Sequence, residues 1–185
     1  FLYQGQEIGM VNFDFTRLSQ LNDVESKKVD KILRRFHVPQ KLRWRILSRT
    51  SRDNARTPFQ WDGGPQGGFT GGRPWLGVNH NCAAINLADQ EKDPDSIWSW
   101  YKDLAALRRD RAALRHGSFV PLEAGAQVFA YRRELEGERM TVVLNFSGKP
   151  ASVSHRGALV RSNYPREGFD GQLGPWEAVI LEEET

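Results

Sequence analysis

The stretch Met140-Thr141-Val142-Val143-Leu144-Asn145-Phe146 decides the fold of the last third of the chain. Most of its residues are β-branched or apolar, and they alternate with a period of two, which is the pattern of a strand. Gln127 to Tyr131 and Ala178 to Leu181 show the same pattern, and turns that contain glycine separate these stretches. Short strands at such intervals predict a small antiparallel β-sandwich.

Upstream of this region the apolar residues recur at helical spacing instead. The range from Pro94 to Leu114 has the clearest helical pattern, and Gly117 follows it as an expected end. Residues 23–36 predict another helix with Asn22 or Asp23 as its cap, and residues 39–47 predict a short one. We therefore expect a domain boundary near residue 116, which divides the chain into residues 1–116 and 117–185.

Two segments of the first part fit neither period. Phe1-Leu2-Tyr3 is a short apolar run that ends at polar and glycine residues, as expected of a buried strand. Residues 51–81 are rich in glycine but contain several isolated aromatic residues. A long loop of this kind is usually functional or disordered, and the aromatic residues argue against disorder.

The composition excludes several classes of function. Of 185 residues, 39% are hydrophobic and 26% are charged, which is ordinary for a soluble globular protein. No apolar run is long enough for a membrane span, so we expect a cytoplasmic protein without a membrane partner. One cysteine and four scattered histidines predict no disulfide, no metal site and no cofactor. The net charge is only +3, and the basic residues between Lys27 and Arg52 fit the solvated face of helices, so we expect no nucleic-acid partner.

The segment from Ser51 to Trp61 is the most informative one for function. Its eleven residues include two arginines, an aspartate, two amides and a tryptophan. Sugar sites combine such groups, because arginine binds pairs of oxygens and aromatic faces cover the apolar side of a sugar ring. Judged by the residues alone, Arg52, Asp53 and Arg56 equally fit a loop that ion pairs tie together.

Five segments in order resemble the closing third of oligo-1,6-glucosidases, dextran glucosidases and related α-glucosidases of glycoside hydrolase family 13, in the α-amylase superfamily. The resemblance covers nearly the whole chain, and its longest match has eleven residues. The matching segments are Phe1 to Met10, Asn22 to Glu25, Ser51 to Trp61, Gly68 to Thr70 with Pro74-Trp75, and Pro175 to Ala178.

The resemblance implies the last part of a (β/α)8 barrel, with Phe1-Leu2-Tyr3 as the eighth strand, a long excursion loop and a last helix, followed by an antiparallel β-sandwich. It also implies a retaining, exo-acting glucosidase that cleaves α-1,6- or α-1,4-linked gluco-oligosaccharides. A whole barrel needs about 250 residues, so the resemblance implies a fragment. The family's three catalytic carboxylates lie on earlier strands, and none is assigned here. The expected partners are the oligosaccharide and the missing N-terminal part of the polypeptide, without which we expect no activity.

Two binding roles are implied by position. Arg52 matches an arginine that, paired with an acid of the missing N-terminal part, holds the non-reducing-end glucose in the minus-one subsite. Glu25 matches an acid that lies beside the plus-one subsite and hydrogen-bonds the leaving sugar. A set of neighbours is expected to brace the loop that presents Arg52. These loop-support residues are Asp53, Asn54, Arg56, Gln60 and Trp61.

Some residues depart from the family pattern and leave other activities open. Gln6 stands where glutamate is frequent, Phe59 where methionine is common, and Lys27-Lys28 where neutral residues are usual. Trehalose synthases and sucrose isomerases use the same scaffold. A carbohydrate-binding module formed by residues 118–185 is a further alternative, but that region has only one tryptophan, Trp176.

Overall fold

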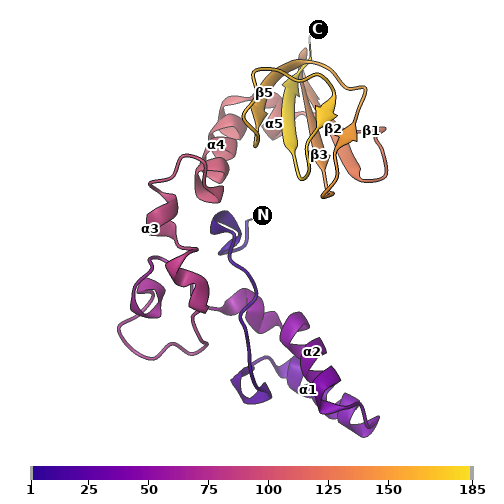
Figure 1. Cartoon of the computed structure of the whole chain (residues 1–185). Coiled ribbons are helices and arrows are strands. Elements are labelled where there is room, and N and C mark those ends of the chain that lie inside the picture. Colours follow the sequence, from indigo (N-terminus) through magenta and orange to yellow (C-terminus); the bar gives the residue numbers. More distant parts are fainter. Residues whose placement is uncertain (1, 184–185) are drawn as a thin grey trace. The chain divides into compact units, whose positions relative to one another are not determined.

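The computed structural model describes residues 2–183, and Figure 1 shows its helices and strands. The contacts within the chain divide it into two compact units, Phe1–Tyr101 and Lys102–Thr185. The first unit consists of helices and long loops, and the second is built on a β-sheet. Among the described residues, no helix has both the length and the apolar character that crossing a membrane requires.

The first unit contains three α-helices and the start of a fourth. They are α1 (Val24–Arg35), α2 (Gln40–Thr50), α3 (Leu87–Gln90) and α4 (Ile97–Asp110). The predicted helices at residues 23–36 and 39–47 are confirmed. Helix α1 begins where the Asp23 carboxylate accepts a hydrogen bond from the Ser26 N–H, which satisfies a donor that the helix leaves open. Pro39 precedes α2, where its missing N–H costs nothing.

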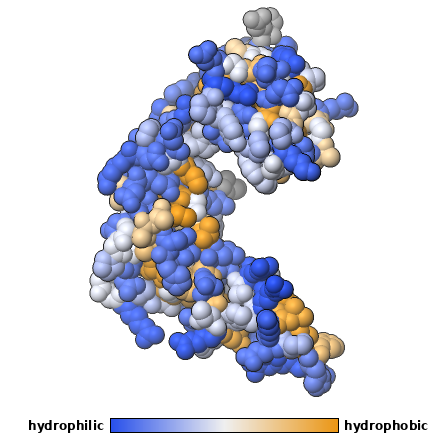
Figure 2. Space-filling view, viewed as in Figure 1, coloured by the Kyte–Doolittle hydropathy of each residue, from blue (hydrophilic) through white to orange (hydrophobic). Residues whose placement is uncertain are grey.

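The core of the first unit lies away from α1. Its buried apolar residues are Phe13, Phe15, Leu21, Leu47 and Leu76. Helix α1 buries only Ser26 and Asp30, and its Asp30 carboxylate joins α2 through an ion pair to Arg43 at 3.1 Å. Figure 2 shows apolar surface over α1 and α2. The large apolar side chains exposed there are Val24, Val29, Ile32, Phe36, Leu42 and Ile46.

The start of the chain and the long loop have little regular structure. Phe1 lies outside the described residues, and Leu2 and Tyr3 belong to no strand in the range 2–183. A strand exists only through hydrogen bonds to a neighbour, and the described residues pair no strand with these two. Residues 51–81 contain the short 3-10 turns Arg52–Arg56 and Pro65–Gly68, and a third turn, His80–Ala83, follows at the end of the loop.

The second unit is an antiparallel sheet of five strands in the order β1-β2-β3-β7-β5, with a separate two-stranded sheet, β4-β6. Figure 1 shows these strands together in orange and yellow. The strands are β1 (Ser118–Leu122), β2 (Val128–Leu135), β3 (Glu138–Asn145), β4 (Ala151–Ser152), β5 (Ala158–Ser162), β6 (Gln172–Leu173) and β7 (Ala178–Glu182). Each of the three strands that the alternating pattern predicts is present.

Both faces of the five-stranded sheet are covered, as its strands with two apolar faces require. On one face Met140, Val142 and Ile180 pack with Leu114 of α5 (Ala112–His116) and with Leu104 of α4. On the other face Val143, Val179 and Leu181 pack with Leu173 of the small sheet. The central strands β3 and β7 therefore hold most of the core.

The long helix predicted from Pro94 to Leu114 is divided in the structure. Helix α4 ends at Asp110, Arg111 has an extended backbone, and α5 begins at Ala112. The Ala113 N–H at the start of α5 donates to the Glu138 carboxylate at 2.9 Å. Gly117 does end α5, but with φ at −60° its role is to save space, because a Cβ there would lie 2.5 Å from the Ala113 carbonyl oxygen.

Candidate functional site

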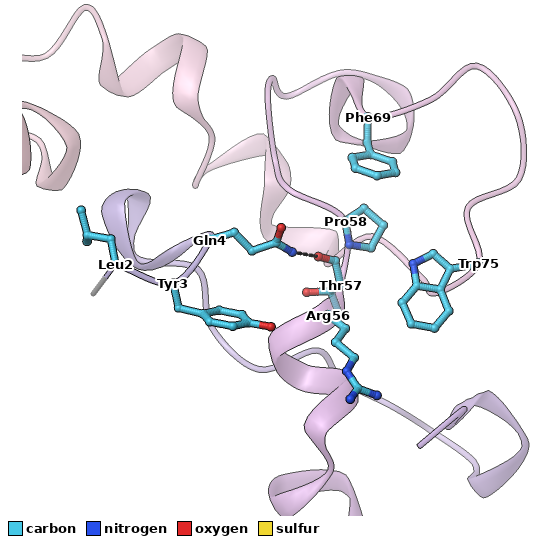
Figure 3. Close-up of a pocket in the computed structure, with 8 residues that line it drawn as sticks. All are labelled: Leu2, Tyr3, Gln4, Arg56, Thr57, Pro58, Phe69 and Trp75. Carbon is cyan, nitrogen blue, oxygen red and sulfur yellow. Dashed lines mark hydrogen bonds between the residues drawn. The ribbon is translucent and has the colours of Figure 1, made fainter. Parts of the chain in front are cut away.

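An open pocket of about 560 Å³ joins the start of the chain to the long loop. Figure 3 shows Tyr3 and Gln4 on one side of it and the rings of Phe69 and Trp75 on the other. The Gln4 side-chain amide donates to the Thr57 carbonyl at 3.5 Å and so connects the two segments. The remaining lining residues are Leu2, Arg56, Thr57 and Pro58. Exposed aromatic faces beside amide and guanidinium donors are suited to a sugar ring.

Arg52 is held by a carboxylate that lies far away in the sequence. Its Nε and Nη2 both donate to Oδ1 of Asp23, at 3.0 Å and 2.7 Å. Asp23 is almost fully buried, whereas the Arg52 side chain is 57% exposed. The third nitrogen, Nη1, has no hydrogen-bond partner among residues 2–183, so it is available to a ligand.

Asp53, the residue after Arg52, makes a second connection between the long loop and the segment around Asp23. Its Oδ2 accepts hydrogen bonds from the backbone N–H groups of Asn22 and Asp23, at 2.6 Å and 2.8 Å. Asp53 is fully buried, and the Ser51 hydroxyl accepts a hydrogen bond from its N–H at 3.3 Å. The turn that presents Arg52 is therefore fixed to the residues that precede α1.

The charges around this connection shift two pKa values. Burial acts to raise the pKa of Asp23, but hydrogen bonds from Arg52 and Ser26 and the charge of Arg52 outweigh it and lower the pKa from 3.8 to about 2. The hydrogen bond to Asp23 raises the pKa of Arg52, and the charges of Asp23, Glu25 and Asp53 add to this. Both groups are thus charged at neutral pH.

Glu25 lies in the first turn of α1, two residues beyond Asp23. Its exposed carboxylate is 3.0 Å from the Lys28 ammonium, in an ion pair whose two side chains both reach solvent. Because Arg52 binds Asp23, the two predicted binding residues share one neighbourhood of the first unit. Exposed ion pairs of this kind are weak, so the Glu25 carboxylate is free to accept a hydrogen bond from another donor.

The predicted loop-support residues are divided between interior and surface. Asn54 donates to the Ser48 carbonyl at 2.8 Å, and buried Gln60 donates to Asn81 at 3.2 Å and to the Ile85 carbonyl. Arg56 lies 3.7 Å from Asp53 and reaches the pocket of Figure 3. Trp61 is half-exposed, with its ring centroid 4.6 Å from that of Phe59.

Several residues of this region were not among the predicted binding residues. Tyr3, Gln4, Phe69 and Trp75 line the pocket, although Arg52 does not. Phe69 and Trp75 could have been found in the sequence, because they are isolated aromatic residues in a glycine-rich loop. The partnership of Asp23 with Arg52 had no such signal, since it joins residues 29 apart.

Comparisons with known proteins agree with this architecture. Residues 1–117 match the family model described as the alpha amylase catalytic domain, and residues 118–180 match the maltogenic amylase C-terminal domain. An oligo-1,6-glucosidase from Halalkalibacterium halodurans is 42% identical over 97% of the chain and 34% of its own length. A trehalose-6-phosphate hydrolase from Escherichia coli is 40% identical over 97% of the chain and 34% of its own length.

A solved structure extends the likeness to three dimensions. The trehalulose synthase from Pseudomonas mesoacidophila superposes with a TM-score of 0.90 at 35% identity, over 98% of the chain and 35% of its own length. The chain thus spans about a third of the length of the relatives that it matches. Because the catalytic-domain model matches well over half of its residues, the chain belongs to the α-amylase family.

Proposed function

We propose that these residues are the C-terminal third of a retaining, exo-acting α-glucosidase that removes glucose from the non-reducing end of α-1,6- or α-1,4-linked gluco-oligosaccharides. The proposed partners are that oligosaccharide and the preceding part of the same polypeptide. The relatives support this reading, because each is about three times as long as the chain. Residues 1–116 then complete the catalytic barrel, and residues 117–185 form its C-terminal domain.

One observation supports a sugar-binding role for Arg52 above all others. Two of its nitrogens are held by buried Asp23, and yet more than half of its side chain faces solvent. A planar donor group that is fixed at one edge and open at the other is suited to a pair of sugar hydroxyls. We assign it to the glucose of the minus-one subsite, and this contact favours cleavage from the chain end.

Glu25 is proposed to accept a hydrogen bond from the leaving sugar in the plus-one subsite. Glu25 lies in the first turn of α1, directly after the capping residue Asp23, and its carboxylate is exposed beside Lys28. We propose that the interior side of the loop is supported by three residues that are hydrogen-bonded to other segments: Asp53, Asn54 and Gln60. Arg56 and Trp61 are placed at its surface.

The chemistry of the reaction is assigned to carboxylates of the preceding polypeptide. In a retaining mechanism one carboxylate attacks the anomeric carbon and displaces the leaving oxygen, which a carboxylic acid protonates. Water then hydrolyses the glycosyl-enzyme. The residues of this chain hold the two sugars on either side of the cleaved bond, and such positioning contributes to the rate by reducing the entropy of the reacting groups.

The test is glucose release from isomaltose and maltose. We expect the full-length enzyme to be active, residues 1–185 alone to be inactive, and Arg52→Ala in the full-length enzyme to lower kcat/KM about a hundredfold, which is about 2.7 kcal/mol of transition-state binding. Arg45→Ala is the matched control, because Arg45 is an exposed arginine of the neighbouring helix α2. Activity of residues 1–185 alone would place the catalytic carboxylates among their own acids and contradict the proposal.

A sucrose isomerase is the second candidate, because the trehalulose synthase is 35% identical to the chain and superposes on it with a TM-score of 0.90. Both activities need the terminal glucose to be bound in the same way. They differ in whether water or the leaving sugar accepts the glucosyl group from the enzyme. Incubation of the full-length enzyme with sucrose, followed by separation of the products, distinguishes them. Rearranged disaccharides in excess of free glucose identify the isomerase, and free glucose from isomaltose identifies the glucosidase.

A further inference from the structure

Asp23 uses its two carboxylate oxygens for two different tasks. Oδ1 accepts both hydrogen bonds from Arg52, at 3.0 Å and 2.7 Å. Oδ2 accepts from the N–H and the hydroxyl of Ser26, at 3.1 Å and 2.8 Å, and so caps α1. One buried side chain therefore orients an arginine of the long loop and sets the start of the helix that contains Glu25.

The contact with Arg52 fixes a side chain that is otherwise free to move. A solvent-exposed arginine has many rotamers, and ordering it costs conformational entropy. Because Nε and Nη2 both bind one oxygen, the guanidinium plane is fixed and its third nitrogen is held in one direction. Nothing else among residues 2–183 binds the guanidinium of Arg52.

The position of Asp23 is itself well determined. Its backbone N–H donates to Oδ2 of Asp53 at 2.8 Å, and Asp53 is the residue next to Arg52. The two segments are therefore connected twice, once from the Asp23 side chain to Arg52 and once from the Asp53 side chain to the backbone of Asp23. A closed arrangement of this kind holds a side chain far more rigidly than a single ion pair does.

From this geometry we infer that Asp23 is the positioning residue of the site, which orients Arg52 toward the terminal glucose and places Glu25 toward the leaving sugar. The inference rests on the proposed function of Arg52 and Glu25. Asp23 itself touches no sugar, because its oxygens are occupied by Arg52 and Ser26 and it is only 3% exposed. It acts on the substrate only through its neighbours.

Asp23→Asn in the full-length enzyme separates the two tasks. Asparagine is as good a helix cap as aspartate, so α1 keeps its start. The amide that replaces one oxygen has no negative charge to hold Arg52 and offers it a donor where it needs an acceptor. Since misplacement of a binding group by about 1 Å costs up to about a hundredfold in rate, we expect kcat/KM to fall about 10- to 100-fold. We also expect weaker inhibition by glucose, which reports on the minus-one subsite.

A double-mutant cycle tests whether Asp23 acts through Arg52. In an Arg52→Ala background, we expect Asp23→Asn to change kcat/KM by less than about threefold, because the group that it positions is gone. Ser26→Ala is the matched control, since it removes a hydrogen bond from Oδ2 and leaves Oδ1 with Arg52. We expect this control to keep kcat/KM within about threefold of the wild type.

Four outcomes would overturn the inference. Asp23→Asn could leave kcat/KM unchanged while Arg52→Ala lowers it, in which case Arg52 binds sugar without its partner and only the inference fails. Equal losses in both backgrounds, or a loss in Ser26→Ala as large as in Asp23→Asn, would make Asp23 merely structural. No effect of Arg52→Ala would reject the proposed function as well. If Asp23→Asn does not fold, Asp23→Ser, which also caps helices but is too short to reach Arg52, enters the same cycle.

Discussion

Arg111 and Glu182 form a two-pronged ion pair, with Nη1 2.9 Å from Oε1 and Nη2 3.0 Å from Oε2. Arg111 is the residue at which the helix is interrupted between α4 and α5, and Glu182 ends the last strand, β7. Arg111 also lies 3.5 Å from Glu138, which accepts the first hydrogen bond of α5. The break in the helix is thus held by the sheet on which α5 packs.

Arg111→Ala is therefore expected to destabilise the second unit. The side chains of Arg111 and Glu182 are 34% and 40% exposed, so we expect a loss of about 1 kcal/mol rather than the larger cost of a fully buried pair. Arg109→Ala is the control, because within residues 2–183 Arg109 is paired only with its exposed neighbour Asp110. Hydrogen exchange of the β3 and β7 amides measures the difference within this unit. Equal exchange in the two variants would show that the ion pair of Arg111 does not stabilise this unit.

A buried carboxylate in the same unit gives a larger expected effect. Glu177 is 1% exposed, and it accepts hydrogen bonds from Ser162 at 3.0 Å and from the Gly174 N–H at 2.6 Å. Arg166 supplies the charge that balances it, with Nε at 3.1 Å. Arg166→Ala leaves this charge buried and unpaired, which costs about 3–5 kcal/mol for such pairs.

Glu177→Gln in the same chain tests the cause of that loss. The amide removes the buried charge and keeps the size of the side chain, so we expect the double variant to be more stable than Arg166→Ala alone. Urea unfolding of the wild type, Arg166→Ala and the double variant measures this order. A double variant as unstable as the single one would show that Arg166 contributes through packing and not through charge.

Helices and strands could be predicted from the sequence where the spacing of apolar residues fitted only one kind of element. The alternation in Met140–Phe146 predicted β3, and the spacing after Asp23 predicted α1 and its cap. The interruption at Arg111 was not predictable, because arginine is a good helix former and the partners of Arg111, Glu138 and Glu182, lie 27 and 71 residues away in the sequence. Leu2 and Tyr3 have a strand-like sequence, but a strand also needs a neighbour with which to pair.

The sequence predicted residue types for the site and could not predict their connections. The mixture of guanidinium, amide and aromatic groups in Ser51–Trp61 fits either a sugar site or an ion-paired loop, and the resemblance to a family singled out Arg52, so the sugar site stays a prediction. That Asp53 faces the backbone of Asn22 and Asp23 depends on how two distant segments pack. A sequence read along its length gives no information on such a contact, and for that reason Asp53 was assigned only a general supporting role.

Asp53→Ala is expected to loosen the turn that presents Arg52. The change leaves two backbone N–H groups, of Asn22 and Asp23, without their acceptor, and each unpaired buried donor costs about 1–3 kcal/mol. Asp53→Asn is the matched control, because its carbonyl oxygen can still accept both hydrogen bonds. We expect the thermal midpoint to fall by several degrees more in the alanine variant. Equal midpoints would show that water replaces the carboxylate at this place.

The lowered pKa of Asp23 makes the stability of the fold depend on pH in the acid range. Its pKa falls from 3.8 to about 2 on folding, so the charged form stabilises the fold above the unfolded pKa, and this contribution is lost as the pH falls through the folded pKa. The shift corresponds to about 1–2 kcal/mol after allowance for the exposure of Arg52.

Urea unfolding of the wild type and Asp23→Asn at several pH values measures this contribution. We expect a constant difference in unfolding free energy at neutral pH, which shrinks between about pH 4 and pH 2 as the aspartate of the wild type becomes uncharged like asparagine. Asp170→Asn is the control, because hydrogen bonding to Gln172 also lowers the pKa of this exposed aspartate, without a buried ion pair. If the difference for Asp23 persisted at pH 2, its hydrogen bonds to Ser26, and not the charge that faces Arg52, would account for its stabilising effect.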